Sequence, residues 1–493
     1  MSGSKISTER ILEDMDGLQA LTMSGGHETL PPKVIESLRR ELRGHLLLSG
    51  DQGYELARQV WNGMVDHRPA LIAQCVAVSD VVACVNFARE RQLLISVRGG
   101  GHNYAGKAVC HGGLVIDLSL MKGIQVEPEQ RTVRAQAGLR LGEFDLETQK
   151  FGLATTLGVN TDTGIAGLTL GGGYGWLAGK YGLACDNLLS AEVVTADGCV
   201  VHCNADRHED LFWGLRGAGA NFGVVTTFEY RLHALTNVLG GIILHPLQAD
   251  ILSFFDEFSR SAADELTTTG VVLSGPNGKP AFASIACYCG ALDEGERALR
   301  PLRTVAKPLL DSIQPRSYLE MQSLLDATWP PGRHYYNKAH NISRLSDGAV
   351  ETILKYSATL PTVLTNIALQ QLHGAASRIP FHETAFPHRY DHYDVLVHPA
   401  TDNPPDTDKM VRWARECWKA LEPFAERAVY VNALEDALEE GEARVREAYG
   451  PNYEKLVSLK SKYDPQNMFR QNSNIRPKSK SIESVANLSR SEA

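Results

Sequence analysis

The sequence lacks any apolar run as long as the roughly 18 residues that a membrane-spanning helix needs. One of its most apolar stretches, residues 238–244, is interrupted by glycines and ends at His245. The N-terminal residues also lack the basic start, apolar middle and small-residue cleavage site of a secretory signal. These absences predict a cytoplasmic protein that has no membrane partner.

The sequence also has fewer positively charged than negatively charged residues. The chain has 49 Lys and Arg residues against 58 Asp and Glu residues, which gives a formal net charge of −9 at pH 7. Proteins that bind nucleic acids usually carry a basic patch or stripe, so we expect no nucleic-acid partner. Composition leaves the oligomeric state open.

The cysteines lack the pattern of a disulfide framework or of a metal site. There are nine of them, an odd and scattered set in a long chain. The two closest pairs, Cys199 with Cys203 and Cys287 with Cys289, have no second pair of Cys or His residues at zinc-site spacing. We therefore expect free thiols and no bound metal.

What the sequence does have is length and an ordinary globular composition. Its 493 residues exceed one typical domain, and 43% hydrophobic with 22% charged residues is typical of a folded chain. Short β-type runs alternate with helical patterns from about residue 45 to 235, which predicts a mixed α/β domain. From 236 to 430, strand-like runs separated by longer helical segments predict an antiparallel sheet covered by helices. The expected divisions are an arm and helix over 1–44, domains over 45–235 and 236–430, a C-terminal segment over 431–477, and a flexible tail over 478–493.

Within the first division, about thirty polar residues predict a loosely attached arm. Pro31 and Pro32 then open a helix, because proline is tolerated in the first turn.

Two glycine-rich segments are the main candidates for a ligand site. The first is RGGGHN at residues 98–103, directly after an expected strand, and the second covers residues 164–175. Glycine lets the backbone turn sharply and approach a ligand closely, and consecutive N–H groups can bind an anion such as a pyrophosphate. A histidine at the end of such a loop, His102, either meets the ligand or caps the turn.

A third glycine cluster, residues 217–223, predicts either ligand contact or a tight turn before the strand that starts at Val224. Gly173, Gly175 and Ala178 also match the dinucleotide-binding fingerprint, with Ala in the last place. A nicotinamide-dependent enzyme is therefore one alternative, although no β-branched strand precedes the match.

Five ordered motifs carry a resemblance to a known family. They are RGGGHN at 98–103, the glycine-rich segment at 164–175, KYGLACDN at 180–187, RGAGANFG at 216–223, and KYDPQNMFR at 462–470 followed by Asn472. Through them the chain resembles, over about residues 45–477, the vanillyl-alcohol oxidase family of flavin oxidoreductases. Within that family it is similar to the berberine-bridge-enzyme-like branch.

This resemblance implies an α+β fold with a two-subdomain FAD-binding domain of vanillyl-alcohol oxidase type. FAD would lie between two α/β subdomains over 45–235, and the antiparallel sheet over 236–430 would belong to a substrate domain. The segment 431–477 would return to the FAD-binding domain. The residues implied in cofactor binding are His102, Arg98, Gly99, Gly100, Gly101, Asn103, Gly158, Thr161, Asp162, Gly164, Gly167, Leu168, Gly171, Gly172, Gly173, Gly175, Asp186, Asn187, Asn221, Val224 and Asn472.

The resemblance further implies that His102 bonds covalently to the 8α-methyl carbon of the flavin, since a neutral imidazole is a nucleophile. Some relatives add a second bond, from a cysteine to the 6-carbon of the flavin, but that place is occupied here by Asn160. We therefore expect attachment through His102 alone. Gly99 stands where relatives usually have serine, which weakens local hydrogen bonding without abolishing attachment.

Oxidation of an alcohol, amine or phenol needs a base that takes the O–H or N–H proton while hydride leaves the adjacent carbon. Tyr449, in a segment similar to the tyrosine-bearing segment of the family, is the first candidate for this base, and Tyr453 is the second. The alternative for Tyr449 is a buried ring with a satisfied hydroxyl. Residues 384–389, TAFPHR, also resemble a family segment on the sheet of the substrate domain, and the alternative is a structural turn onto a strand.

The function expected from these features is that of an FAD-dependent oxidase acting on a small alcohol, amine or phenolic molecule. Dioxygen would reoxidise the flavin, and hydrogen peroxide would form. Two alternatives of the same fold are a flavin dehydrogenase that uses another acceptor and a catalytically silent flavin-binding protein. Substrate identity rests on family resemblance alone and stays open.

Overall fold

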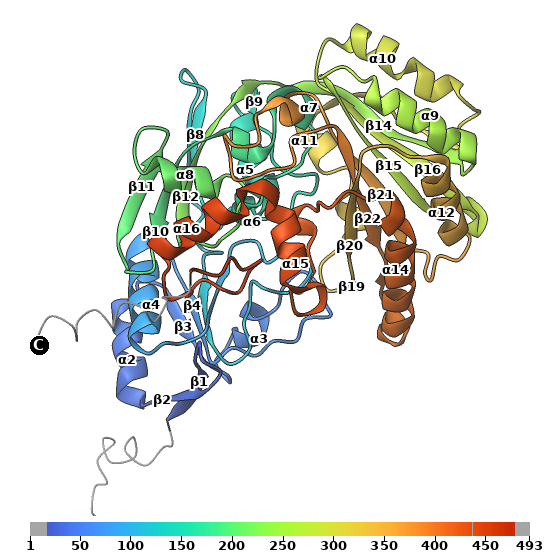
Figure 1. The fold of residues 1–493 in the computed structure, drawn as a ribbon. Helices are drawn as coiled ribbons and strands as arrows, with labels where there is room; N and C mark the ends of the chain where they lie inside the picture. Colours follow the sequence, from blue (N-terminus) through green and yellow to red (C-terminus); the bar gives the residue numbers. More distant parts are fainter. Residues whose placement is uncertain (1–16, 436, 479–493) are drawn as a thin grey trace, which may run out of the picture.

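The computed structural model describes residues 17–435 and 437–478. Residues 1–16 of the expected arm and residues 479–493 of the expected flexible tail lie outside this description. Three larger sheets organise the chain (Figure 1). The first sheet has the order β3-β4-β6-β5, with β4 and β5 both parallel to β6. Its strands are β3 (His45–Leu47), β4 (Leu71–Gln74), β5 (Ile95–Arg98) and β6 (Leu114–Asp117).

Helix α4 (Val78–Glu90) joins β4 to β5 and packs on this sheet. Val81, Cys84 and Val85 recur at helical spacing and are fully buried, so one stripe of the helix faces the core. The carboxylate of Asp80 accepts hydrogen bonds from the N–H groups of Val76 and Ala77, which fixes the start of the helix. The parallel strands thus end together at the edge where the loop after Arg98 begins.

The second sheet is antiparallel and has the order β11-β10-β12-β8-β7. Its strands are β7 (Ile124–Glu127), β8 (Thr132–Gln136), β10 (Leu188–Val194), β11 (Val200–Asn204) and β12 (Val224–Arg231). Between β8 and β10 the chain forms α5 (Leu141–Gln149), α6 (Ile165–Leu170) and α7 (Ala178–Tyr181). The first and second sheets share one hydrophobic core.

The third sheet has eight antiparallel strands and carries the other half of the molecule (Figure 1). Its path is β17-β14-β16-β15-β21-β22-β20, and β18 pairs with β14. The strands are β14 (Asn237–Pro246), β15 (Leu266–Ser274), β16 (Pro280–Tyr288), β17 (Leu310–Asp311), β18 (Gln314–Ser317), β20 (Lys338–Ile342), β21 (Asn366–Leu372) and β22 (His392–His398). The expected α+β fold class, with a helix-covered antiparallel sheet, is confirmed.

Strand β22 shows why this sheet has one apolar and one polar face. Tyr393, Val395 and Val397 alternate along the strand and pack against the covering helices in one core. Those helices are α9 (Ala249–Arg260), α12 (Asp347–Ser357) and α14 (Thr407–Leu421). The intervening residues, among them Asp394 and His398, point to the opposite face because side chains alternate along a strand.

The C-terminal segment returns to the first half of the molecule. In Figure 1, α15 (Ala437–Tyr449) and α16 (Tyr453–Tyr463) lie across it in red. Lys460 is fully buried and forms an ion pair of 2.7 Å with Asp464, and its ammonium also donates to the carbonyls of Asn221 and Phe469. These bonds hold the end of α16 against the loop that precedes β12.

The expectation of a loose N-terminal arm is wrong for residues 17–30. They form a hairpin of β1 (Leu18–Leu21) and β2 (His27–Leu30), in which Ala20 and Leu30 are buried. The hairpin is tied to the first half of the chain, because the Leu21 N–H donates to the Gly112 carbonyl at 2.7 Å. Composition gave no sign of this contact, which depends on residues about ninety positions away. Helix α2 (Pro32–Glu41) begins where Pro31 and Pro32 predicted it.

The nicotinamide alternative is also wrong. The fingerprint needs a strand, a glycine turn and then a long helix. Here the six-residue helix α6 precedes Gly173, and only the four-residue helix α7 follows. Gly173 instead has a φ of +89°, and its N–H donates to the hydroxyl of Tyr430.

Candidate active site

A cavity of about 320 Å³ lies where the glycine-rich loops, the polar face of the third sheet and the C-terminal segment meet. The expected cofactor residues that line it are Gly99, Gly100, Gly101, His102, Asn103, Gly158, Gly164, Gly167, Leu168 and Asn472. The residues Gln370, Asp394, Leu396 and His398 line it from the third sheet. Sequence positions almost three hundred residues apart therefore face one space.

Gly100 and Gly164 explain why both glycine-rich segments are needed. A Cβ atom at Gly100 would lie 2.4 Å from the backbone nitrogen of Gly164, and one at Gly164 would lie 2.4 Å from that of Gly100. Real Cβ atoms do not approach backbone so closely, so only glycine allows the two loops to touch. Their contact brings His102 of the first loop beside Asp162 of the second.

His102 is held in one orientation by two neighbours. Its Nε2 atom lies 2.8 Å from the Oδ1 atom of Asp162. Its ring stacks on Trp61 with centroids 4.5 Å apart and an interplanar angle of 22°. Trp61 in turn stacks on Tyr335 of the third-sheet half at 3.8 Å. The predicted attachment residue therefore lies at the cavity wall with a fixed ring plane.

The loop that ends in His102 has the donors that a pyrophosphate needs. Within the described part of the chain, no backbone N–H from Gly99 to Asn103 donates a hydrogen bond to a protein carbonyl. Consecutive N–H groups without a backbone partner can bind an anion such as a pyrophosphate. A Cβ atom at Gly167, across the cavity, would meet no protein atom within 4 Å. The residues present therefore fit a dinucleotide cofactor such as FAD.

Gly167→Val should reduce cofactor retention without disturbing the fold, because the added carbons enter the cavity and not the protein core. Overfilling a packed site typically costs about 1–3 kcal/mol, which corresponds to roughly 5–150-fold in affinity. The measurement is flavin absorbance per protein after gel filtration. Gly26→Val, at an exposed turn where a Cβ makes only ordinary contacts, is the matched control. Equal flavin content in both variants would contradict this placement of the cofactor.

Asp394 is the most unusual side chain of the cavity. It is fully buried, and neither carboxyl oxygen has a hydrogen-bond partner among the described residues. Gln370 on β21 and Asn341 on β20 lie directly opposite it in the sheet register. Burial raises the pKa of Asp394 to about 8, with a smaller opposing effect from Arg444.

His398 lies four residues further along the same face of β22. It is 6% exposed, and neither ring nitrogen has a partner among the described residues. Burial lowers its pKa to about 3, so the ring is neutral over the physiological range. Polar atoms buried without partners are costly, so Asp394 and His398 are groups that a bound molecule would satisfy.

Two tyrosines form an aromatic wall of the same cavity. Tyr174 and Tyr430 stack with centroids 4.4 Å apart, and both line the space. The Tyr430 hydroxyl accepts a hydrogen bond from the Gly173 N–H at 3.0 Å, and burial raises its pKa well above the usual range. This wall is therefore neutral and rigid, and it suits a flat or ring-containing ligand.

The sequence did not indicate Asp394, Gln370, His398 or Tyr430 as site residues. The available signal was the pattern HYDVLVH at 392–398, in which polar and apolar residues alternate on a strand. Alternation predicts two different faces. It does not show whether the polar face meets water or a cavity, and that depends on the arrangement of the two halves of the chain.

The predicted base Tyr449 also lines the cavity, but its hydroxyl is already hydrogen-bonded within the protein. It lies 2.9 Å from the carbonyl of Ala218 and 3.0 Å from that of Ser473, and the side-chain amide of Asn221 lies 3.3 Å away. Burial raises the pKa of Tyr449 well above its ordinary value, so the phenolate that would accept a proton is scarcely populated at neutral pH. The role of Tyr449 as base stays a prediction, and its contacts favour the structural alternative.

Tyr453, the second candidate, does not line the cavity. Its ring packs in the core of the first half of the molecule, with the Arg446 guanidinium 4.1 Å from the ring centroid. The structure thus brings the two tyrosines near each other, at 6.4 Å between centroids, without placing both at the site.

The other residues expected to bind the cofactor lie behind the cavity wall. Gly171, Gly172, Gly173 and Gly175 allow close packing, since a Cβ at Gly175 would lie 2.5 Å from the Leu157 carbonyl. The remaining members of this group are Arg98, Thr161, Asp162, Asp186, Asn187, Asn221 and Val224. Several of them bond to neighbouring loops, as Arg98 does to the Ala57 carbonyl and Asn187 to the carbonyls of Tyr181 and Leu183.

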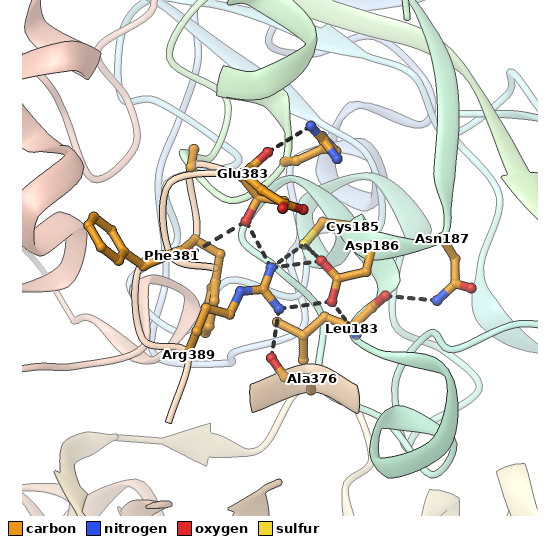
Figure 2. A network of polar contacts seen from close by, with 12 residues as sticks. Leu183, Cys185, Asp186, Asn187, Ala376, Phe381, Glu383 and Arg389 are labelled. Carbon is orange, nitrogen blue, oxygen red and sulfur yellow. Dashed lines mark hydrogen bonds and ion pairs between the residues drawn. The ribbon is translucent and has the colours of Figure 1, made fainter. Parts of the chain in front are cut away.

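Asp186 belongs to a buried ion pair with Arg389 (Figure 2). The two guanidinium nitrogens of Arg389 lie 2.8 and 2.7 Å from the two carboxylate oxygens of Asp186. Arg389 also donates to the Ala376 carbonyl, and Asp186 accepts from the Leu183 N–H. Figure 2 shows that the pair joins two segments from different halves of the chain. Residues 384–389 therefore lead into β22 without regular secondary structure, and none of them lines the cavity.

The structure has no helix that is long and apolar enough to cross a membrane within residues 17–435 and 437–478. The same described residues hold no cluster of three or more His, Cys, Asp or Glu side chains that could bind a metal ion.

Comparisons with known proteins agree with the fold and cavity, which define a flavoprotein oxidoreductase. A family profile described as FAD binding domain matches residues 69–204, and one described as berberine and berberine like matches residues 429–476. The (R)-6-hydroxynicotine oxidase of Paenarthrobacter nicotinovorans is 32% identical over 460 residues, covering 88% of this chain and 97% of that protein. An FAD-linked oxidoreductase of Dictyostelium discoideum is 31% identical over 461 residues, covering 90% and 97%.

Among solved structures, 6-hydroxy-D-nicotine oxidase from Arthrobacter nicotinovorans has a TM-score of 0.81 at 32% identity, covering 89% of this chain and 98% of that one. The chain belongs to the vanillyl-alcohol oxidase and berberine-bridge-enzyme-like family of FAD-linked oxidoreductases. FAD is accordingly its cofactor, and the expectation of an FAD-dependent oxidoreductase is confirmed.

Proposed function

We propose that this protein is an oxidase that removes a hydride from a carbon bearing a hydroxyl or amine in a small molecule, with Asp394 as the proton acceptor. The observation that carries the proposal is the fully buried Asp394 carboxyl, without a protein partner, on the cavity wall opposite the glycine-rich loops. Bound FAD supplies the hydride acceptor. Dioxygen is the proposed final oxidant, and hydrogen peroxide is the proposed product.

Asp394 has the pKa that a base needs at neutral pH. A base is most effective when its pKa lies near the working pH, and burial raises that of Asp394 to about 8. Its ionised form must be present for proton transfer, so the rate should rise with pH up to about 8. An ordinary exposed carboxylate would be a much weaker acceptor.

The cavity also supports a substrate class. The stacked Tyr174 and Tyr430 provide a flat wall, and Gln370 and neutral His398 offer hydrogen bonds without a net charge. A ring-containing alcohol, phenol or amine fits these features. The relative from P. nicotinovorans is itself named as an oxidase of a hydroxylated nicotine, which supports both an oxidase and a ring-containing substrate.

We also propose that FAD is attached through His102 alone, since His102 lies at the cavity wall and Asn160 has no thiol. Asn160 is 8% exposed, and the Oδ1 atom of its side-chain amide has no partner among the described residues. The nine cysteines are unpaired in the structure, which supports the reducing cytoplasm as the proposed location.

Denaturing electrophoresis under ultraviolet light tests this attachment. The wild-type protein should show flavin fluorescence that moves with its 54.0 kDa band, and His102→Ala should lose that fluorescence while still binding FAD reversibly. Wild-type flavin that washes out in acid would contradict covalent attachment and leave FAD binding intact.

Oxygen uptake and peroxide formation with a panel of ring-containing alcohols and amines test the oxidase itself. Flavin reduction without oxygen uptake would instead indicate a dehydrogenase.

A further inference from the structure

The contacts of His102 determine which of its two ring nitrogens is free. Nε2 lies 2.8 Å from Oδ1 of Asp162, while Nδ1 has no hydrogen-bond partner among the described residues. A carboxylate only accepts hydrogen bonds, so the proton of the neutral ring is held on Nε2. The lone pair is therefore on Nδ1, and His102 lines the cavity.

Asp162 is itself held in place by the other half of the chain. The preceding residue, Thr161, donates its backbone N–H to Asp326 at 2.9 Å, and its hydroxyl donates to the same carboxylate. The Gly142 N–H donates to the Thr161 carbonyl at 2.9 Å. The loop that carries Asp162 is thus fixed on both sides, and with it the position of the carboxylate relative to His102.

We propose that Asp162 is the positioning residue for flavin attachment, because it leaves Nδ1 of His102 as the nucleophile. This inference rests on the covalent attachment proposed above. The Nδ1 lone pair forms the bond to the 8α-carbon. One C–H bond of that methyl group breaks, and its proton goes to solvent. The electron pair of the broken bond stays on the flavin ring, and dioxygen then takes up two electrons to form hydrogen peroxide.

Asp162 assists this step in two ways. It selects the tautomer in which Nδ1 is a nucleophile, as a carboxylate does for a histidine that binds a metal. Bond formation at Nδ1 also leaves a proton on Nε2 and a positive charge on the ring. A carboxylate at 2.8 Å stabilises that cation. Trp61 keeps the ring plane fixed by stacking during the same step.

The test follows the covalent fraction of flavin in purified Asp162→Ala and Asp162→Asn proteins during incubation with excess FAD in air. We expect attachment on the order of tenfold slower or more in Asp162→Ala, by analogy with the loss of a carboxylate that orients a metal-binding histidine. Asp162→Asn keeps a hydrogen-bond acceptor without the charge, so its rate should be intermediate. The rates are compared at saturating FAD, so that reversible affinity does not affect them, and Glu147→Gln, an exposed carboxylate paired with Lys150, is the matched control.

Nuclear magnetic resonance of the flavin-bearing peptide from the wild-type protein identifies the bonded nitrogen. Attachment at Nε2, or wild-type attachment rates in both Asp162 variants, would overturn the proposal. A wild-type protein with only reversible flavin would refute the attachment, and with it the role of Asp162, yet its turnover of substrate would still support the proposed oxidase. The two failures are therefore distinguishable.

Discussion

Asp394→Asn is expected to slow reduction of the bound flavin by about 10²–10⁴-fold, the usual contribution of a positioned general base. The amide is nearly isosteric with the carboxyl and cannot accept the substrate proton. Flavin content and the flavin spectrum should not change, because Asp394 lies on β22 and not in the glycine-rich loops. Anaerobic mixing with a substrate found in the panel, followed by flavin absorbance, measures the rate directly.

The pH dependence gives a second signature of the same carboxyl. Wild-type reduction should rise with pH and level off above about 8, the pKa to which burial raises Asp394. The variant should be flat over that range. A reduction rate in Asp394→Asn equal to that of the wild type would place the base elsewhere, with Tyr449 as the next residue to test.

Asp394→Asn should make the protein more stable at high pH, although it slows flavin reduction. A carboxyl whose folded pKa is raised binds its proton more tightly in the folded state. Its contribution to stability is full below the unfolded pKa of about 4. That contribution is lost as pH rises toward 8. Asp394→Asn should therefore unfold at a higher temperature than the wild type at pH 8, with a smaller difference at pH 4.

Asp145 offers a matched control for both effects. It is fully buried on α5, neither of its oxygens has a partner among the described residues, and burial raises its pKa well above the ordinary value. It does not line the cavity. Asp145→Asn should therefore reproduce the stabilisation at high pH and leave the rate of flavin reduction unchanged.

The glycine-rich loops and His102 could be predicted from sequence because their signal is local. A run such as RGGGHN after a strand has few structural uses, and each glycine there replaces a side chain that would clash or block a ligand. The structure gives the reason at Gly100 and Gly164, whose backbones touch. Motif, spacing and geometry thus point to the same loop.

Asp394 could not be predicted in the same way. A lone polar residue on an apolar strand is more often a satisfied core residue than a reacting group, and only the register against Gln370 and Asn341 shows what surrounds it. The contact between His102 and its partner could not be predicted from the sequence either. Asp162 was expected near the cofactor, yet its contact with His102 spans 60 residues and depends on the packing of two loops.

Removal of the Arg389 side chain is expected to have the largest effect on stability. Arg389 and Asp186 are 2% and 4% exposed as side chains and meet through two parallel hydrogen bonds. Arg389→Met leaves the Asp186 carboxylate buried without its ion-pair partner, which typically costs about 3–5 kcal/mol. The midpoint of thermal unfolding should fall by roughly 3–5 °C, since the entropy of unfolding of a chain this long is about 1 kcal/mol per kelvin.

The pair also links stability to the cofactor site. The neighbouring Cys185 N–H donates to the Gly172 carbonyl at 2.9 Å, so the segment that Arg389 holds also holds the glycine-rich loop. Flavin retention in Arg389→Met should therefore decrease together with the unfolding midpoint.

A double variant separates the charge from the packing. Asp186→Leu with Arg389→Met removes both charges, so its loss should be smaller than the sum of the two single losses, because no buried charge is left unpaired. Arg378→Ala is the control, since the Arg378–Asp264 pair is 60% and 40% exposed and such surface pairs contribute under about 1 kcal/mol. Additive losses in the double variant, or an Arg389→Met loss no larger than that of Arg378→Ala, would show that the buried pair does not hold the two halves of the chain together.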